Sequence, residues 1–149
     1  MIKSDAQLAR TRTQIEGFRR VITEMESQPG VPEDLIKAVA ASHRGMIAKL
    51  EAEIAEYEDA KRGLVRLPRI QSPRDLGVHL IKFRIALGMT QEQLAELVGT
   101  TRQTINKHEE QEYQLASVDL ITRVSDALGL LPEIQVKHKI LDVRQPMPA

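Results

Sequence analysis

The sequence predicts a mainly α-helical fold in which an antiparallel helical hairpin precedes a bundle of four shorter helices. Two observations predict it: apolar residues recur at helical spacing, and residues that start or stop helices punctuate the pattern. The composition agrees, because 28% of the 149 residues are charged and only 3% are aromatic. We therefore expect a hairpin at residues 1–66, a helical bundle at 67–131, and a short strand with a flexible tail at 132–149.

The first long helix is expected over residues 4–28. Its apolar residues follow one another at intervals of seven, three, four and three residues, which places them on one helical stripe: Leu8, Ile15, Phe18, Ile22 and Met25. Pro29 and Pro32 then break the helix, because proline is not tolerated in helix interiors. Pro32 followed by two acidic residues favours a new helix start, and Gly63 ends that second helix.

The second long helix is expected to run to about Arg62. Its predicted inner face consists of Ile36, Val39, His43, Met46, Leu50, Ile54 and Tyr57. Two long helices joined by a short turn lie antiparallel and bury their stripes against each other, so we expect a coiled-coil-like hairpin. The alternative is one interrupted helix with a solvated face. Because a pair of helices buries little surface, we expect the hairpin to serve for homodimerisation or as an arm for a partner.

Composition and charge exclude several classes of protein. The absence of cysteine excludes disulfides, thiolate metal sites and cysteine nucleophiles, and suits a reducing cytoplasm, where we expect the protein to reside. Residues 1–20 interleave charged and apolar residues, unlike an export signal, and no apolar run is long enough to span a membrane. The formal net charge of +0 means that a DNA-binding surface would have to be small and local.

Two short stretches alternate apolar and polar residues and predict edge strands. One lies at residues 64–71, where Pro68 limits any strand to a sheet edge, and the other at residues 134–140. The last residues, 142–149, contain two prolines and are expected to be a disordered tail.

Four shorter helices are expected between these stretches. The residues that start them are Ser72, Thr90, Thr100 and Ser117, and the glycines that stop three of them are Gly88, Gly99 and Gly129. The expected inner residues are Leu76, Leu80, Phe83 and Leu87 in the first helix, and Val118, Ile121, Val124 and Leu128 in the last.

The two middle helices carry the most informative spacing. Two helices that cross steeply through a short turn need a small residue where they approach, a residue able to turn sharply, and an apolar side chain from the second helix. Ala95, Gly99 and Ile105 supply these in order, and Leu94 and Val98 lie beside them. The pattern predicts a helix-turn-helix motif.

The stretch from Gln91 to Glu109, followed by the helix from Ser117 to Gly129, resembles the Cro and repressor (XRE) family of lambdoid phages. The resemblance covers about residues 70–131. It implies a sequence-specific repressor that binds double-stranded DNA, reads an inverted-repeat operator as a homodimer, and places residues 100–107 in the major groove.

The resemblance also implies roles for individual residues. The base-reading residues would be Thr101, Arg102, Gln103, Asn106 and Lys107, of types that can recognise guanine or adenine edges. The phosphate contacts would be Gln91, Thr104, Gln114 and Ser117. Arg84 and Glu109 would form a structural ion pair that orients the recognition helix. Gln103 has an alternative role, which is to complete a capping box with Thr100.

Two features depart from the family pattern. His108 stands where an apolar residue usually closes the core, and we expect a partly buried histidine with a satisfied ring; the alternative is a pH sensor. Glu110 and Glu112 replace the glycine-containing turn that usually follows the recognition helix, which brings acidic side chains close to the expected DNA surface.

No arrangement of residues points to an enzyme, a metal or a cofactor. The four histidines are scattered, and no glycine-rich phosphate loop is present. Two alternatives to a plain DNA-binding repressor stay open. The layout resembles HigA-type antitoxins, which neutralise a toxin protein and repress their own operon. The domain could also be a protein-interaction module that binds no DNA.

Overall fold

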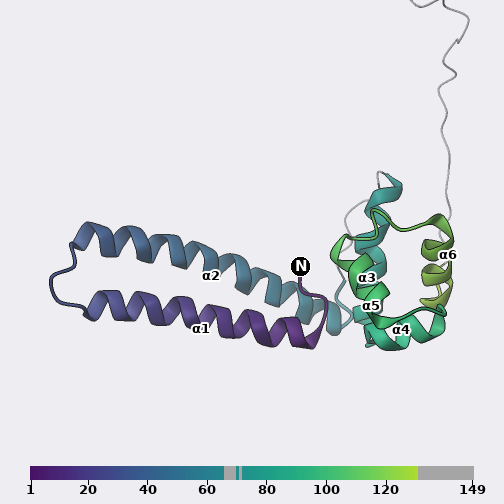
Figure 1. Cartoon of the computed structure of the whole chain (residues 1–149), viewed down its shortest axis with the longest axis horizontal. Helices are drawn as coiled ribbons and strands as arrows, with labels where there is room; N and C mark the ends of the chain where they lie inside the picture. Colours follow the sequence, from purple (N-terminus) through teal and green to yellow (C-terminus); the bar gives the residue numbers. More distant parts are fainter. Residues whose placement is uncertain (66–69, 71, 131–149) are drawn as a thin grey trace, which may run out of the picture.

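The computed structural model describes residues 1–65, 70 and 72–130. Its helices are α1 (Asp5–Ser27), α2 (Glu33–Lys61), the 3-10 turn η1 (Pro73–Asp75), α3 (Leu76–Ala86), α4 (Gln91–Leu97), α5 (Arg102–Glu110) and α6 (Val118–Ala127). The long hairpin of α1 and α2 projects to one side of a compact bundle formed by α3 to α6 (Figure 1). The predicted mainly α-helical fold, with a hairpin before a bundle of shorter helices, is confirmed, and the part of the chain that the structure describes contains no strand.

The hairpin forms as its sequence pattern predicts. The Ser4 side chain caps α1 by accepting a hydrogen bond from the Gln7 N–H, and Gly30 turns the chain with a φ of +85°. The buried residues that join the two helices are Ile15 and Ile22 in α1 and Ala40 and Ile47 in α2. Met46 was expected inside but is 51% exposed, because Ala40 and Ile47 take the positions that face α1.

The bundle has its own core, formed by residues from all four of its helices. Leu80, Ile81, Leu94, Ile105 and Val124 are almost fully buried there. The prediction that Leu87 points inward was wrong. Leu87 is the C-cap residue of α3 and is 57% exposed, whereas Ile81 and Ile85 of α3 are buried.

One inward position in α6 was also predicted wrongly. Val118 is 79% exposed because it is the first residue of α6, at the edge of the bundle. Leu120 is buried in the core cluster instead, together with Val124 and Leu128. The core-facing stripe of α6 therefore begins two residues later than expected.

The base of the hairpin shares this core. Ile2, Tyr57 and Ala60 belong to the same buried cluster as the bundle residues, and α2 packs on α3. An ion pair of 2.7 Å between Lys82 Nζ and Glu56 Oε1 joins α3 to α2. The hairpin is therefore packed against the bundle rather than tethered to it by the connecting segment alone.

The predicted strands and tail fall largely outside the described residues. Leu64, Val65 and Ile70 are described and have no regular structure. Residues 66–69, 71 and 131–149 lie outside the description, so the two strands and the tail remain predictions.

Candidate nucleic-acid interface

The crossing of α4 and α5 has the geometry that the spacing predicted. Ala95 is buried where the helices approach, and Gly99 has a φ of +67°, which an L side chain rarely adopts. The Thr100 N–H donates to the Ala95 carbonyl at 2.9 Å and closes the end of α4 as a Schellman motif. Ile105 is fully buried and supplies the apolar contact from α5.

The start of α5 lies one residue later than expected. Thr101 is the N-cap, and its side chain accepts a hydrogen bond from the Thr104 N–H. The alternative in which Gln103 completes a capping box with Thr100 is therefore wrong, because Thr100 belongs to the turn that ends α4. Gln103 is left as an exposed side chain in the first turn of α5.

The outward face of α5 forms a protruding ridge. Arg102, Gln103 and Lys107 are exposed, whereas Ile105 points inward. Arg102 also lines a cavity of about 360 Å³ between the first turn of α4 and the hairpin base, where Lys3 and Lys61 contribute further cations. The three exposed side chains have the donor and acceptor types that can recognise guanine or adenine edges.

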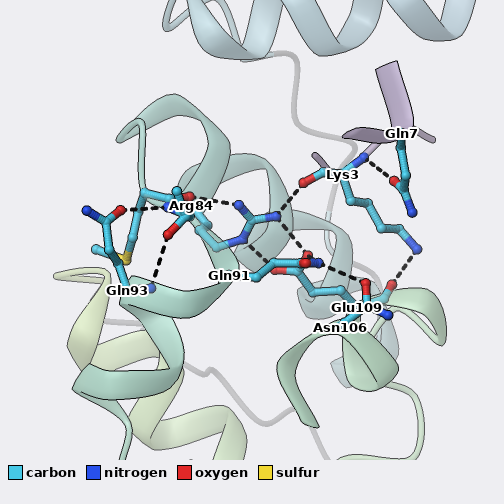
Figure 2. Close-up of polar contacts among 9 residues, drawn as sticks. Lys3, Gln7, Arg84, Gln91, Gln93, Asn106 and Glu109 are labelled. Atoms are coloured by element: carbon cyan, nitrogen blue, oxygen red, sulfur yellow. Dashed lines mark hydrogen bonds and ion pairs between the residues drawn. The ribbon is translucent and has the colours of Figure 1, made fainter. Parts of the chain in front are cut away.

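Two of the expected DNA contacts, Gln91 and Asn106, lie in a polar network with Glu109 (Figure 2). Gln91 is 5% exposed, and its Nε2 donates to Glu109 Oε2 at 2.8 Å and to Asn106 Oδ1 at 3.3 Å. Asn106 Nδ2 donates to Glu110 Oε1 at 2.9 Å. DNA contacts by these two amides would require such bonds to be exchanged, although the Gln91 backbone N–H remains in the first turn of α4.

The predicted ion pair between Arg84 and Glu109 is present. Arg84 Nε lies 2.5 Å from Glu109 Oε1, and Arg84 Nη2 lies 2.7 Å from Oε2. Both residues are buried, with Arg84 3% and Glu109 0% exposed. The pair anchors the C-terminal part of α5 to α3.

The other expected phosphate contacts lie along α5 and at the start of α6. The Thr104 hydroxyl lies 2.9 Å from the Thr101 hydroxyl, and the Ser117 side chain caps α6 by accepting from the Leu120 N–H. Gln114 is exposed in the connection between the two helices. Phosphate binding by these residues remains a prediction.

Two residues in the turn after α5 have a strained backbone conformation. Glu112 has a φ of +49° and Tyr113 a φ of +57°, in the left-handed region that favours glycine. The turn presses against α3 at Gly77, where a Cβ atom would lie 1.8 Å from the Glu112 carbonyl oxygen. The turn can therefore approach α3 this closely only because position 77 has no side chain.

His108 and Tyr113 stack beside this turn, with ring centroids 6.1 Å apart. The expectation of a satisfied histidine ring was wrong: among the described residues, His108 Nδ1 is buried and has no hydrogen-bond partner, and the same holds for the Tyr113 hydroxyl. Burial raises the pKa of Tyr113 above its ordinary value, and the nearby Glu109 carboxylate adds to this increase.

A second polar group lies at the hairpin base. Lys61 Nζ donates to Asp5 Oδ1 at 2.8 Å, and the Tyr57 hydroxyl donates to the same oxygen at 3.1 Å. The hydrogen bond from Lys61 lowers the pKa of Asp5, whereas burial and the bond to Asp5 raise the pKa of Tyr57 to about 12.

Two residues that were not predicted from the sequence support the interface. Arg123 in α6 donates from Nη1 to the Val98 carbonyl at 2.6 Å and so ties α6 to the end of α4. Lys3 contacts both Arg84 and Glu109 from the segment before α1. No sequence signal identified Lys3, because its contacts span 81 and 106 residues.

Comparisons with known proteins agree with this geometry. Residues 80–134 match the family model described as helix-turn-helix. No curated protein and no solved structure matches the chain. Within residues 1–65, 70 and 72–130, no three His, Asp or Glu side chains are arranged to hold a metal ion. The described helices are all too short or too polar to cross a membrane.

Proposed function

Residues 80–134 are a helix-turn-helix domain of the Cro/C1 (XRE) type, typical of DNA-binding regulators, and from this premise we propose that the chain is a repressor which reads an inverted-repeat operator as a homodimer. The observation that carries the proposal is the ridge on α5. Arg102, Gln103 and Lys107 are exposed on a helix that is anchored by the fully buried Ile105. A short helix with this division between exposed polar and buried apolar residues fits the major groove.

The ridge supplies specificity, and the helix starts around it supply orientation. Arginine or lysine can make bidentate contacts with guanine, and glutamine with adenine. The backbone N–H groups at the start of α4, together with Gln114 and Ser117 before α6, would face phosphates and fix the orientation of the domain without selecting a sequence.

Selection of bound fragments from random duplex DNA tests the proposal directly. The purified protein is expected to enrich an inverted repeat whose half-sites lie about one helical turn, roughly 34 Å, apart. The double variant Arg102→Ala/Lys107→Ala should enrich no sequence, whereas Arg20→Ala/Lys49→Ala removes the same charges from exposed positions in the hairpin and should select the wild-type repeat. If the wild-type protein enriches no sequence at all, operator reading is excluded.

The homodimer is proposed because one helix-turn-helix domain has a single recognition helix of nine residues, and one such helix covers one half-site. Sedimentation equilibrium of the full chain should give twice the monomer mass of 16.8 kDa at micromolar concentration. A monomer mass both free and on the selected DNA would contradict an inverted-repeat reader.

An antitoxin is the second candidate, and the projecting hairpin favours it. The hairpin projects away from the helix-turn-helix domain, and the side chains of Leu35 and Met46 on it are each about half exposed. A toxin partner should form a complex of fixed stoichiometry, and the hairpin alone should not bind DNA. If an excess of this protein leaves the activity of a candidate toxin unchanged, that toxin is excluded as its partner. A chain that binds protein but selects no DNA would instead be a protein-interaction module.

A further inference from the structure

The segment before α1 contacts both the hairpin and the helical bundle, through Ile2 and Lys3. Ile2 is 3% exposed and lies in the core shared by the hairpin base and the bundle. Lys3 is 8% exposed, and its backbone N–H donates to Gln7 Oε1 at 2.8 Å, which ties it to the first turns of α1. This segment therefore has a fixed position against both parts of the molecule.

Lys3 contacts both members of the ion pair that anchors α5 (Figure 2). Its Nζ donates to the Glu109 backbone carbonyl, and its own carbonyl accepts a hydrogen bond from Arg84 Nη2 at 2.8 Å. One residue of the N-terminal segment thus holds α5 through Glu109 and α3 through Arg84.

The Lys3 ammonium lies at the end of α5 that attracts a cation. The carbonyl groups in the last turn of a helix carry a partial negative charge, so a buried ammonium there stabilises the helix end. The Glu109 carbonyl also accepts the Glu112 N–H at 3.0 Å, which starts the strained turn after α5. Lys3 therefore stabilises the point at which the recognition helix stops and the chain turns.

We propose that Lys3 is a positioning residue for the recognition helix, through which the hairpin determines how α5 is presented to DNA. The path is continuous: Lys3 holds Glu109, the Glu109 carboxylate accepts from Gln91, and the Gln91 amide also donates to Asn106 on α5. The inference rests on the proposed function for its effect on DNA, but the network itself can be tested without DNA.

The first experiment uses the free full chain. Lys3→Met keeps most of the aliphatic stem and removes the ammonium, and Lys49→Met is the matched control on the exposed side of α2. The side-chain amide resonances of Gln91 and Asn106 should shift in the Lys3 variant and stay in place in the control. Resonances that are unchanged in both variants would overturn the proposal, whether or not the protein binds DNA.

The second experiment uses the selected operator. Lys3→Met should weaken operator binding about three- to tenfold relative to random DNA, the range expected of residues that act through an intervening network. The salt dependence should stay unchanged, because Lys3 touches no phosphate in this proposal. An unchanged ratio of specific to nonspecific affinity, or a salt slope reduced by about one, would overturn it. Failure of the wild-type protein to select any operator would instead refute the proposed function, leaving the resonance experiment to decide on Lys3.

Discussion

The guanidinium of Arg84 and the carboxylate of Glu109 form a buried, bidentate ion pair. The carboxylate accepts two hydrogen bonds from Arg84 and a third from Gln91. The remaining bonds of Arg84 go to the carbonyls of Met89 and Lys3. A buried pair of charges is tolerated when its hydrogen-bonding groups are satisfied in this way. The pair therefore fixes α5 on α3 with little freedom to shift.

Removal of one member of this pair should be costly. Arg84→Met leaves the Glu109 carboxylate buried without its cation, and we expect the free energy of unfolding to fall by about 3–5 kcal/mol in urea denaturation. Arg84→Lys should retain little of the stability that Arg84→Met loses, because an ammonium cannot make the bidentate contact. Arg84→Met combined with Glu109→Leu should regain at least half of the loss, since neither charge of the pair is then left buried without the other. Additive losses in the double variant would contradict this account.

Gly77 should tolerate no side chain. In Gly77→Ala the new Cβ would lie 1.8 Å from the Glu112 carbonyl oxygen, so the turn after α5 must move away from α3. We expect a loss of more than about 3 kcal/mol, as for other severe overpacking. Gly45→Ala is the matched control, because its Cβ would meet nothing within 4 Å on the exposed side of α2. That change should stabilise the protein by up to about 1 kcal/mol, and equal effects at both positions would exclude the close approach.

Glu112→Gly should stabilise the protein although it removes a side chain. The left-handed backbone at a φ of +49° strains glutamate but not glycine, so we expect a gain of up to about 1 kcal/mol in the free energy of unfolding. Glu110→Gly makes the same chemical change in the last turn of α5 and should destabilise by about 1 kcal/mol. Thermal unfolding of the two variants should therefore shift in opposite directions.

Much of this architecture could be predicted from the sequence because it depends on local rules. The Pro29 to Pro32 turn, the helix start at Thr90 and the sharp turn at Gly99 each depend on a few neighbouring residues, and all are present. The buried faces were harder to predict. Leu87 and Val118 follow the helical period but lie at helix ends, where position in the bundle outweighs periodicity.

The polar interior of the candidate site could not be predicted in full. The resemblance identified Arg84 and Glu109, but it assigned Gln91 to a phosphate contact rather than to Glu109, and the contribution of Lys3 depends on how the hairpin packs against the bundle. The two contacts of Lys3 join residues 81 and 106 positions apart, and no sequence periodicity reports them. The exposed ridge was predictable because Ile105 determines which face of α5 points inward.

Stability should fall at high pH because both tyrosines are buried. The pKa of Tyr57 is raised to about 12 and that of Tyr113 is also raised, so the folded protein keeps protons that the unfolded chain loses from about pH 10 upward. The contribution of the two tyrosines to the unfolding free energy should therefore be constant below about pH 9 and decrease above about pH 10, by up to about 1.4 kcal/mol per pH unit for each tyrosine. Urea unfolding at several pH values measures this slope.

Tyr113→Phe provides the control for this pH effect. Its hydroxyl has no hydrogen-bond partner among the described residues, so the variant should be at least as stable as the wild type at neutral pH. Above pH 10 it should lose stability less steeply, since only Tyr57 then contributes. A Phe variant that is less stable at neutral pH would show that the hydroxyl has a partner, such as a buried water.

Arg102→Ala should change which sequence is read rather than only how tightly DNA is held. Arg102 is exposed in the first turn of α5, where a guanidinium can reach guanine O6 and N7. Loss of one such bidentate contact should cost about 1–3 kcal/mol of operator affinity per half-site and relax the base preference at one position in each. Arg20→Ala removes the same charge from the exposed face of α1 and should leave both the affinity and the preference unchanged.

Competition binding against a panel of singly substituted operators separates the loss of affinity from the loss of base preference, because a phosphate contact would weaken all operators equally. Equal weakening of every operator by Arg102→Ala would assign Arg102 to the phosphate backbone and leave Gln103 and Lys107 as the base readers.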